Sequence, residues 1–172
     1  MSYFDISIKD NFLEKNIFDE VYLKIDRLTY SAKGNYQEGS SHIWYSCPAE
    51  DKIKKYITKK CEEKINKKLE CVLCSYTMLA TVEPLPHHDK GDGQCDYQVI
   101  IYIKGNTNLH KGTGFYVHNE KTKSYELNTH IGFFQNRGII FDSSNWHTPM
   151  NWSSDDKSKR FSIIAQFKNY DE

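Results

Sequence analysis

The sequence has no long apolar segment and no excess of either charge. Its longest apolar run, Val99–Ile103, is far too short to cross a bilayer. Its 23 basic and 23 acidic residues give a formal net charge of zero, which provides no overall attraction for nucleic acid or for an anionic membrane. We therefore expect neither as a partner. The first ten residues lack a basic-then-apolar signal pattern, so we expect a cytoplasmic protein.

The number of cysteines is odd. Five cysteines leave one unpaired in any disulfide scheme, so we expect free thiols in a reducing compartment. Cys71 and Cys74 are spaced like half of a zinc site, but no second Cys or His pair follows at finger spacing. On a regularly alternating strand, residues three apart point to opposite faces, which also argues against zinc at this pair.

Two amphipathic helices are predicted in residues 1–70. The first is expected to run from Asn11, with Glu14 closing a capping box, to about residue 29. A polar, Gly/Ser-rich loop is expected over 31–41. Pro48 is expected to open the second helix, whose lysines form its solvent face.

From residue 71 onward the periodicity changes to that of strands. Seven strands are predicted without an intervening helix, at 71–83, 96–104, 113–118, 124–134, 138–142, 145–148 and 159–168. Many short strands in sequence indicate a two-sheet jelly roll or barrel. We therefore expect a mainly β fold in a single domain, 1–172, with helical support in 1–70 and the β core in 71–168.

A set of polar residues in this β region can form one iron site. His87 and Asp89 flank a single residue, and His147 lies 58 positions beyond Asp89, so a fold that returns the chain there can bring them together. Two imidazoles and one carboxylate occupy one face of an Fe(II) octahedron and leave three positions open. Arg160, 13 residues later, can grip a carboxylate with two parallel hydrogen bonds, and Ser162 points the same way as Arg160 on a strand.

Each of these residues also has a structural explanation when taken alone. His147 beside Trp146 could equally be a core histidine, and Arg160 could be a strand residue in a surface ion pair. However, the sequence contains three arginines among its 23 basic residues, so chance seldom places one at this position. His88 is expected to point away from His87, toward solvent.

The ordered set of motifs resembles the Fe(II)/2-oxoglutarate-dependent dioxygenases, in particular their prolyl 4-hydroxylase-like branch. The resemblance covers roughly residues 70–168. The matching segments are His87-His88-Asp89, Gly91-Asp92-Gly93-Gln94-Cys95, the strand 99–103, Gly112-Thr113-Gly114-Phe115, Gly138-Ile139-Ile140-Phe141, Trp146-His147-Thr148-Pro149 and Arg160-Phe161-Ser162.

The resemblance implies a double-stranded β-helix, the jelly roll or cupin-like barrel of this family, backed by the two helices. It implies that His87, Asp89 and His147 hold catalytic Fe(II), and that Arg160, Ser162 and Tyr102 bind the cosubstrate 2-oxoglutarate. Tyr102 could equally be a core residue, and Tyr76 or Met78 could line the pocket, although packing in the core is the plainer interpretation of both. O₂ is the other co-reactant, ascorbate a supporting reductant, and succinate and CO₂ the co-products.

The expected substrate is a peptide or protein side chain, with proline the first to test. The loops at 90–95, 104–112 and 151–159 are expected to form its polar entrance. Two alternatives stay open. The chain could hydroxylate a free amino acid or small metabolite, or it could be a cupin-like metal-binding protein that does not use 2-oxoglutarate. The sequence does not indicate an oligomeric state.

Overall fold

The protein, represented by a computed structural model, consists of two antiparallel sheets and two helices in the residues that the structure describes, namely 5–33, 44–79, 85–90, 95–150 and 159–170. The larger sheet has seven strands in the order β1-β8-β5-β10-β4-β3-β2, and the smaller has three in the order β7-β6-β9. The strands are β1 (Ile6–Lys9), β2 (Ser31–Lys33), β3 (Trp44–Pro48), β4 (Leu69–Leu79), β5 (Tyr97–Lys104), β6 (Gly112–Asn119), β7 (Ser124–Gly132), β8 (Gly138–Asp142), β9 (Trp146–Met150) and β10 (Arg160–Asn169).

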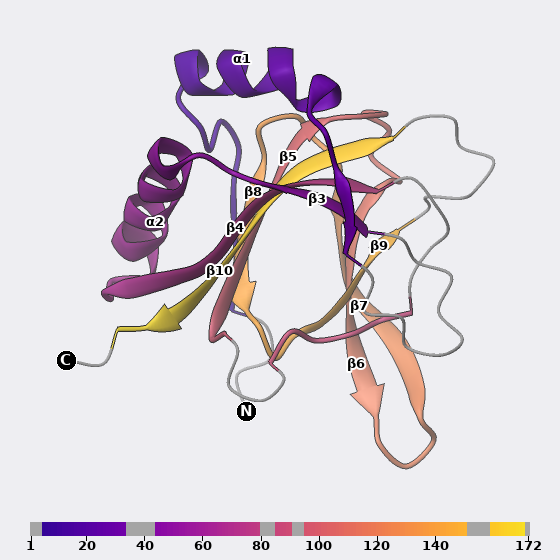
Figure 1. Cartoon of the computed structure of the whole chain (residues 1–172). Coiled ribbons are helices and arrows are strands. Elements are labelled where there is room, and N and C mark those ends of the chain that lie inside the picture. The colour runs from indigo at the N-terminus through magenta and orange to yellow at the C-terminus, as the bar shows by residue number, and fades with distance from the viewer. Residues whose placement is uncertain (1–4, 34–43, 80–84, 91–94, 151–158, 171–172) are drawn as a thin grey trace.

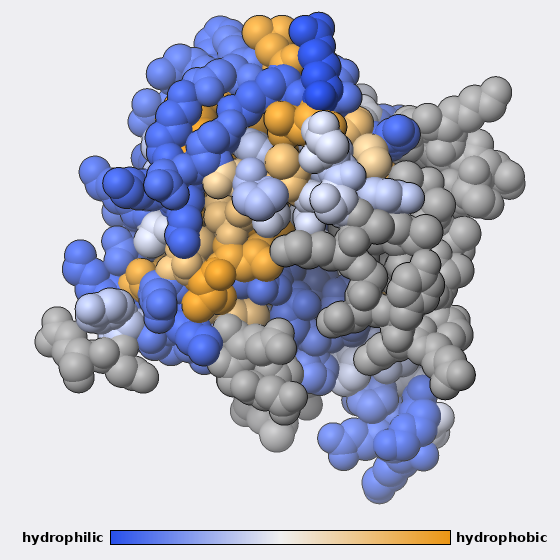
Figure 2. Space-filling model, viewed as in Figure 1, coloured by the Kyte–Doolittle hydropathy of each residue, from blue (hydrophilic) through white to orange (hydrophobic). Residues whose placement is uncertain are grey.

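Helices α1 (Lys15–Lys24) and α2 (Asp51–Ile65) pack against one face of the large sheet, and a short 3-10 turn, η1 (Ile25–Arg27), follows α1 (Figure 1). The hydrophilic outer faces of the helices are visible in Figure 2. No helix in the described part of the chain is long and apolar enough to cross a membrane.

Strand β5 shows why the run 99–103 is apolar throughout. Val99, Ile101 and Ile103 face the helices, whereas Ile100 and Tyr102 face the three-stranded sheet. A strand that is covered on both faces has no solvent-facing positions, so its sequence does not alternate. The second apolar cluster, which includes Tyr102, joins the two sheets beside the candidate site.

All seven predicted strands are present with small shifts at their ends, except that residues 80–83 of the first lie outside the described residues. Three more strands, β1, β2 and β3, lie in the region expected to provide helical support. Ser31–Lys33, expected to be loop, form β2, and the remainder of that loop falls outside the described residues. The mainly β architecture with two supporting helices is confirmed.

Both helices begin later than predicted. Asn11 has a left-handed φ of 52°, and α1 starts at Lys15 after Glu14, without a side-chain capping bond. The capping-box prediction is therefore wrong. The reason is tertiary: the ring of Phe12 packs against Gly138, and the backbone of Leu13 is hydrogen-bonded to the side chain of Asn136.

Pro48 does not open α2, because it ends β3, where it pairs with Ser75. The helix runs from Asp51 to Ile65, and its C-cap residue, Asn66, adopts the left-handed conformation. Ile53, Ile57 and Cys61 form its buried face.

The cysteine geometry corrects an assumption made from the sequence. All five cysteines are free thiols. The register between β10 and β4 shifts so that Phe167 pairs with Cys71 and Gln166 with Leu73, which leaves Val72 as an extra residue. This bulge places Cys71 and Cys74 on the same face of β4, toward α2, and not on opposite faces.

Candidate metal centre and cosubstrate pocket

His87, Asp89 and His147 are brought together by backbone hydrogen bonds between distant segments. The His87 N–H donates to the His147 carbonyl at 3.0 Å, and the His147 N–H donates back to His87 at 2.8 Å. The N–H of Asp89 donates to the Ser143 carbonyl at 3.0 Å. The segment that carries the His-x-Asp sequence is thus joined to β9 and to the turn before it, although 58 residues separate Asp89 from His147.

The three side chains offer one ligand atom each, and these atoms all lie within 4.8 Å of one another. The Nε2 atom of His147 is 3.5 Å from Oδ2 of Asp89. The Nδ1 atoms of His147 and His87 lie 3.0 Å and 3.4 Å from the carbonyls of Asn145 and Leu85. A carbonyl beside Nδ1 favours the proton there and leaves the Nε2 lone pair for a metal.

Electrostatics supports the same assignment. Burial, together with the neighbouring His87, lowers the pKa of His147 to about 4. The imidazole is therefore neutral at physiological pH, which is the form that binds metal. Two neutral nitrogens and one carboxylate, grouped on one side of a cavity, suit an octahedral Fe(II) with open positions. The residues fit this ion.

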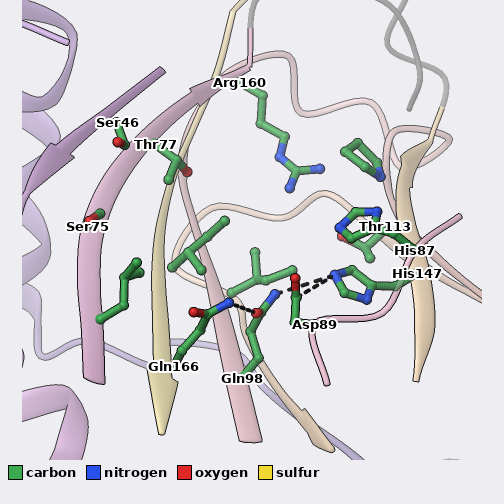
Figure 3. A pocket seen from close by; sticks show the side chains of 14 residues that line it. Ser46, Ser75, Thr77, His87, Asp89, Gln98, Thr113, His147, Arg160 and Gln166 are labelled. Atoms are coloured by element: carbon green, nitrogen blue, oxygen red, sulfur yellow. Dashed lines mark hydrogen bonds and ion pairs between the residues drawn. The ribbon is translucent and has the colours of Figure 1, made fainter. Parts of the chain in front are cut away.

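Arg160, at the start of β10, is buried with 2% exposure and points into the same cavity (Figure 3). Its Nη1 donates to the Gly112 carbonyl at 3.0 Å, and its Nε donates to Ser162 Oγ at 3.3 Å. No carboxylate of the described residues forms an ion pair with it. Burial lowers the pKa of the guanidinium, which shows that its charge is poorly solvated. A buried cation without a counter-ion is costly, so this site favours an anionic ligand.

Gly112 is required at this position. It has φ of 149°, and an added Cβ would lie 2.0 Å from the Ile131 carbonyl oxygen. A residue with a side chain would not fit here, so glycine is what allows this backbone carbonyl to lie against the guanidinium.

Two residues predicted to bind the cosubstrate lie behind Arg160. Ser162 is buried and does not line the cavity, and its hydroxyl accepts the bond from Arg160. The ring of Tyr102 lies 5.2 Å from the Arg160 Cζ and stacks on Phe133. The Tyr102 hydroxyl is 2.6 Å from that of Thr113, which lines the cavity.

The cavity has a volume of about 240 Å³ and connects the candidate metal centre to Arg160. Its other lining residues are neutral, and most were not singled out from the sequence. They are Ser46, Leu73, Ser75, Thr77, Gln98, Ile100, Thr113, Pro149, Ile164 and Gln166. Alternation along the strands was the available signal. It puts Leu73, Ser75 and Thr77 on one face of β4, and it puts Ile164 and Gln166 on one face of β10, the neighbouring strand.

Other residues considered from the sequence lie outside the cavity. Tyr76 and Met78 face the helices, and the Tyr76 hydroxyl bonds to Glu50, so both pack in the core. His88 packs edge-on against Trp146, and neither lines the cavity. Residues 91–94 and 151–158, parts of two expected entrance loops, lie outside the described residues.

Comparison with known proteins gives structural matches but no match in sequence. No family model matches the chain, and no curated protein matches it. Among solved structures, the α-ketoglutarate-dependent epimerase SnoN from nogalamycin biosynthesis aligns with a TM-score of 0.71 at 11% identity, over 95% of this chain and 77% of SnoN. The chain has the fold of the Fe(II)/2-oxoglutarate oxygenases.

Prolyl hydroxylases share this fold. A prolyl-4-hydroxylase from Pseudomonas putida aligns with a TM-score of 0.60 at 10% identity, over 96% of this chain and 93% of that enzyme. The prolyl hydroxylase of Trichoplax adhaerens, solved with a fragment of a hypoxia inducible factor, aligns at 0.63 and 16% identity, over 95% and 83%. A second SnoN structure, at 0.70 and 10% identity over 95% and 78%, holds Fe³⁺, α-ketoglutarate and nogalamycin RO.

Proposed function

We propose that this chain is an Fe(II)- and 2-oxoglutarate-dependent dioxygenase. The observation that carries the proposal is the placement of two complementary sites in one cavity. A His-Asp-His group lies at one side, and a buried arginine without a carboxylate partner among the described residues lies at the other. A dicarboxylic 2-oxo acid has a metal-chelating end and a free carboxylate, so it suits both sites at once.

The residues would divide the work as follows. His87, Asp89 and His147 would hold the iron and leave one face open. When bound, Fe(II) with 2-oxoglutarate and O₂ supplies an oxidant for a substrate C–H bond, with succinate and CO₂ as co-products, and ascorbate can keep the iron reduced. Arg160 would bind the far carboxylate, with Ser162 and the Gly112 carbonyl fixing its orientation. Ile100 and Ile164 provide apolar cover for the cavity floor.

The proposal also includes the type of β fold. We infer that the two sheets are those of a double-stranded β-helix. The isolated bridge between His87 and His147 extends the three-stranded sheet by the segment that follows β4. On this basis the whole chain, 1–172, acts as one catalytic domain.

For the substrate, a prolyl residue in a peptide is the first candidate, supported by the motifs shared with the prolyl 4-hydroxylase-like branch and by the two prolyl hydroxylases of the same fold. A small polar molecule is the second candidate. The cavity wall favours it, because Ser75, Thr77 and Gln166 offer uncharged hydrogen-bonding groups where a small molecule could be enclosed.

The test combines metal binding with turnover. The wild-type protein should bind one Fe(II) or Mn(II) per chain and then 2-oxoglutarate, as measured by anaerobic calorimetry. His147→Ala should lose metal binding and succinate release while keeping the circular dichroism spectrum of the fold. Metal affinity like that of the wild type in this variant would contradict the assignment, and metal binding without any 2-oxoglutarate dependence would favour the cupin-like alternative.

The substrate classes separate by mass spectrometry. A library of proline-containing peptides and a panel of amino acids and polar metabolites would each be incubated with enzyme, Fe(II), ascorbate and 2-oxoglutarate. A gain of one oxygen on proline supports the first candidate. Succinate release stimulated by small molecules alone, with no peptide modified, supports the second.

A further inference from the structure

Two glutamines face each other on the cavity floor beside the metal ligands. Gln98 on β5 and Gln166 on β10 are direct cross-strand partners, and Gln166 Nε2 donates to Gln98 Oε1 at 2.9 Å. Gln98 is buried with 2% exposure. Because this bond uses the carbonyl oxygen of Gln98, it fixes the orientation of the carboxamide. The NH₂ group of Gln98 is turned toward the metal ligands, 3.4 Å from Nε2 of His147 (Figure 3).

Metal binding would remove the acceptor that this NH₂ group now faces. The Nδ1 atom of His147 is directed at the Asn145 carbonyl, so the lone pair offered to a metal is the one on Nε2. A lone pair bound to a metal cannot also accept a hydrogen bond from Gln98. A buried amide donor left without an acceptor is unfavourable. The loaded site therefore needs another acceptor close to the metal, within reach of Gln98.

The cosubstrate can supply that acceptor. Arg160 is the arginine or lysine in the described cavity lining. In the proposed function its guanidinium binds the end of the ligand that is remote from the metal. The carboxylate at the metal end has no second arginine or lysine in that lining. Gln98 is the neutral donor placed there, and hydrogen bonds to a charged oxygen are the stronger class.

Resting on the function proposed above, we infer that Gln98 is a cosubstrate-binding residue and Gln166 a positioning residue. The carboxamide N–H of Gln98 donates to the carboxylate of the 2-oxo acid group that lies at the metal, and Gln166 holds the carboxamide in that orientation. The cavity then recognises both ends of 2-oxoglutarate, Arg160 one carboxylate and Gln98 the other.

Three variants separate this role from a structural one. Gln98→Leu removes the donor at nearly constant volume. Gln166→Glu leaves Gln98 in place but replaces the aligning donor by an acceptor, so the Gln98 carboxamide should turn its NH₂ group toward residue 166. Gln135→Leu is the matched control, because Gln135 lies in the turn between β7 and β8 and does not line the cavity.

The measurement is anaerobic calorimetry in two stages, Mn(II) alone and then 2-oxoglutarate on the Mn(II)-loaded protein. Mn(II) affinity should stay within about threefold of wild type in all variants, whereas 2-oxoglutarate should bind about 10- to 100-fold more weakly to Gln98→Leu and Gln166→Glu. The control should match the wild type. The visible charge-transfer absorption of the Fe(II)/2-oxoglutarate complex should also shift in the two variants, because the chelating carboxylate loses its donor.

Unchanged 2-oxoglutarate affinity in Gln98→Leu would overturn the inference. A parallel loss of Mn(II) affinity would also overturn it, since the donor would then serve Asp89. Thermal unfolding of each variant without ligand checks the fold, and Gln166→Glu provides the test if Gln98→Leu does not fold. If the wild type binds neither Mn(II) nor 2-oxoglutarate, the proposed function fails first, which is a distinguishable result.

Discussion

Arg160→Met is the most informative single substitution, because it separates a ligand-binding arginine from a structural one. Methionine keeps an unbranched, apolar side chain about as long as the aliphatic part of arginine and removes the guanidinium. In the free protein this guanidinium is buried, has no carboxylate partner among the described residues, and makes hydrogen bonds to the Gly112 carbonyl and to Ser162.

Two opposing effects determine the stability of the free variant. Loss of the guanidinium leaves the Gly112 carbonyl without its donor, which costs about 1–3 kcal/mol. The same change removes a buried charge that no carboxylate of the described residues compensates, and the desolvation penalty of such a charge is several kcal/mol. The free energy of unfolding should therefore stay within about 1 kcal/mol of the wild type or rise. If Arg160 were a structural residue, its removal would destabilise the fold by about 3–5 kcal/mol.

Binding should respond in the opposite direction. Truncating one partner of a buried, hydrogen-bonded charge pair costs about 2–5 kcal/mol, which corresponds to about 30-fold to several thousand-fold in affinity. Calorimetry with 2-oxoglutarate on Mn(II)-loaded protein measures this loss, and urea unfolding without ligand measures stability. An unchanged affinity, or a free variant destabilised by more than about 3 kcal/mol, would refute the reasoning.

Two further predictions concern the fold and a thiol. Asn136→Ala should lower the free energy of unfolding in urea by about 2–4 kcal/mol, because it unpairs the buried backbone of Leu13 and puts alanine at a φ of 60°. Asn136→Gly should lower it less, because glycine adopts this φ without strain. Equal losses in the two variants would contradict the backbone contribution. The hydrogen bond from Cys74 lowers the pKa of Cys71 to about 7, whereas burial raises that of Cys61. Since the thiolate is the reactive form, the rate of iodoacetamide labelling at Cys71, mapped by mass spectrometry, should rise as pH increases through about 7, with Cys61 unlabelled in the folded protein. A rate at Cys71 that rises only above about pH 8.5 would contradict this assignment.

The candidate metal site could be predicted because metal binding requires particular residue types, which are visible in the sequence. Two histidines and an aspartate, followed later in the sequence by an Arg-x-Ser, form an ordered set that chance seldom produces. Strand alternation then placed Arg160 and Ser162 on one side of their strand. The strands from residue 69 onward were also predictable, since hydrophobic periodicity reports burial directly. The short strands β1, β2 and β3 were not, because each has little pattern of its own and is defined by its partner: β1 pairs with β8, β3 with β4, and β2 with β3.

The errors have a common physical origin, which is that side-chain direction depends on contacts far along the chain. The predicted capping box at Asn11 failed because Phe12 and Leu13 are held by Gly138 and Asn136, more than 120 residues away. A single extra residue at Val72 put Cys71 and Cys74 on the same face of β4, where opposite faces were expected. The sequence carried no local sign of that bulge.

The Val72 bulge also bears on the site. It lies near the start of β4, next to Leu73, which lines the cavity and pairs with Gln166 on β10. If β4 alternated regularly through this point, Cys71 would share a face with Leu73, Ser75 and Thr77, the residues that line the cavity. The bulge therefore puts Cys71 on the face of β4 that carries Cys74 and Tyr76 and packs under the helices, while Leu73, Ser75 and Thr77 line the cavity on the other face.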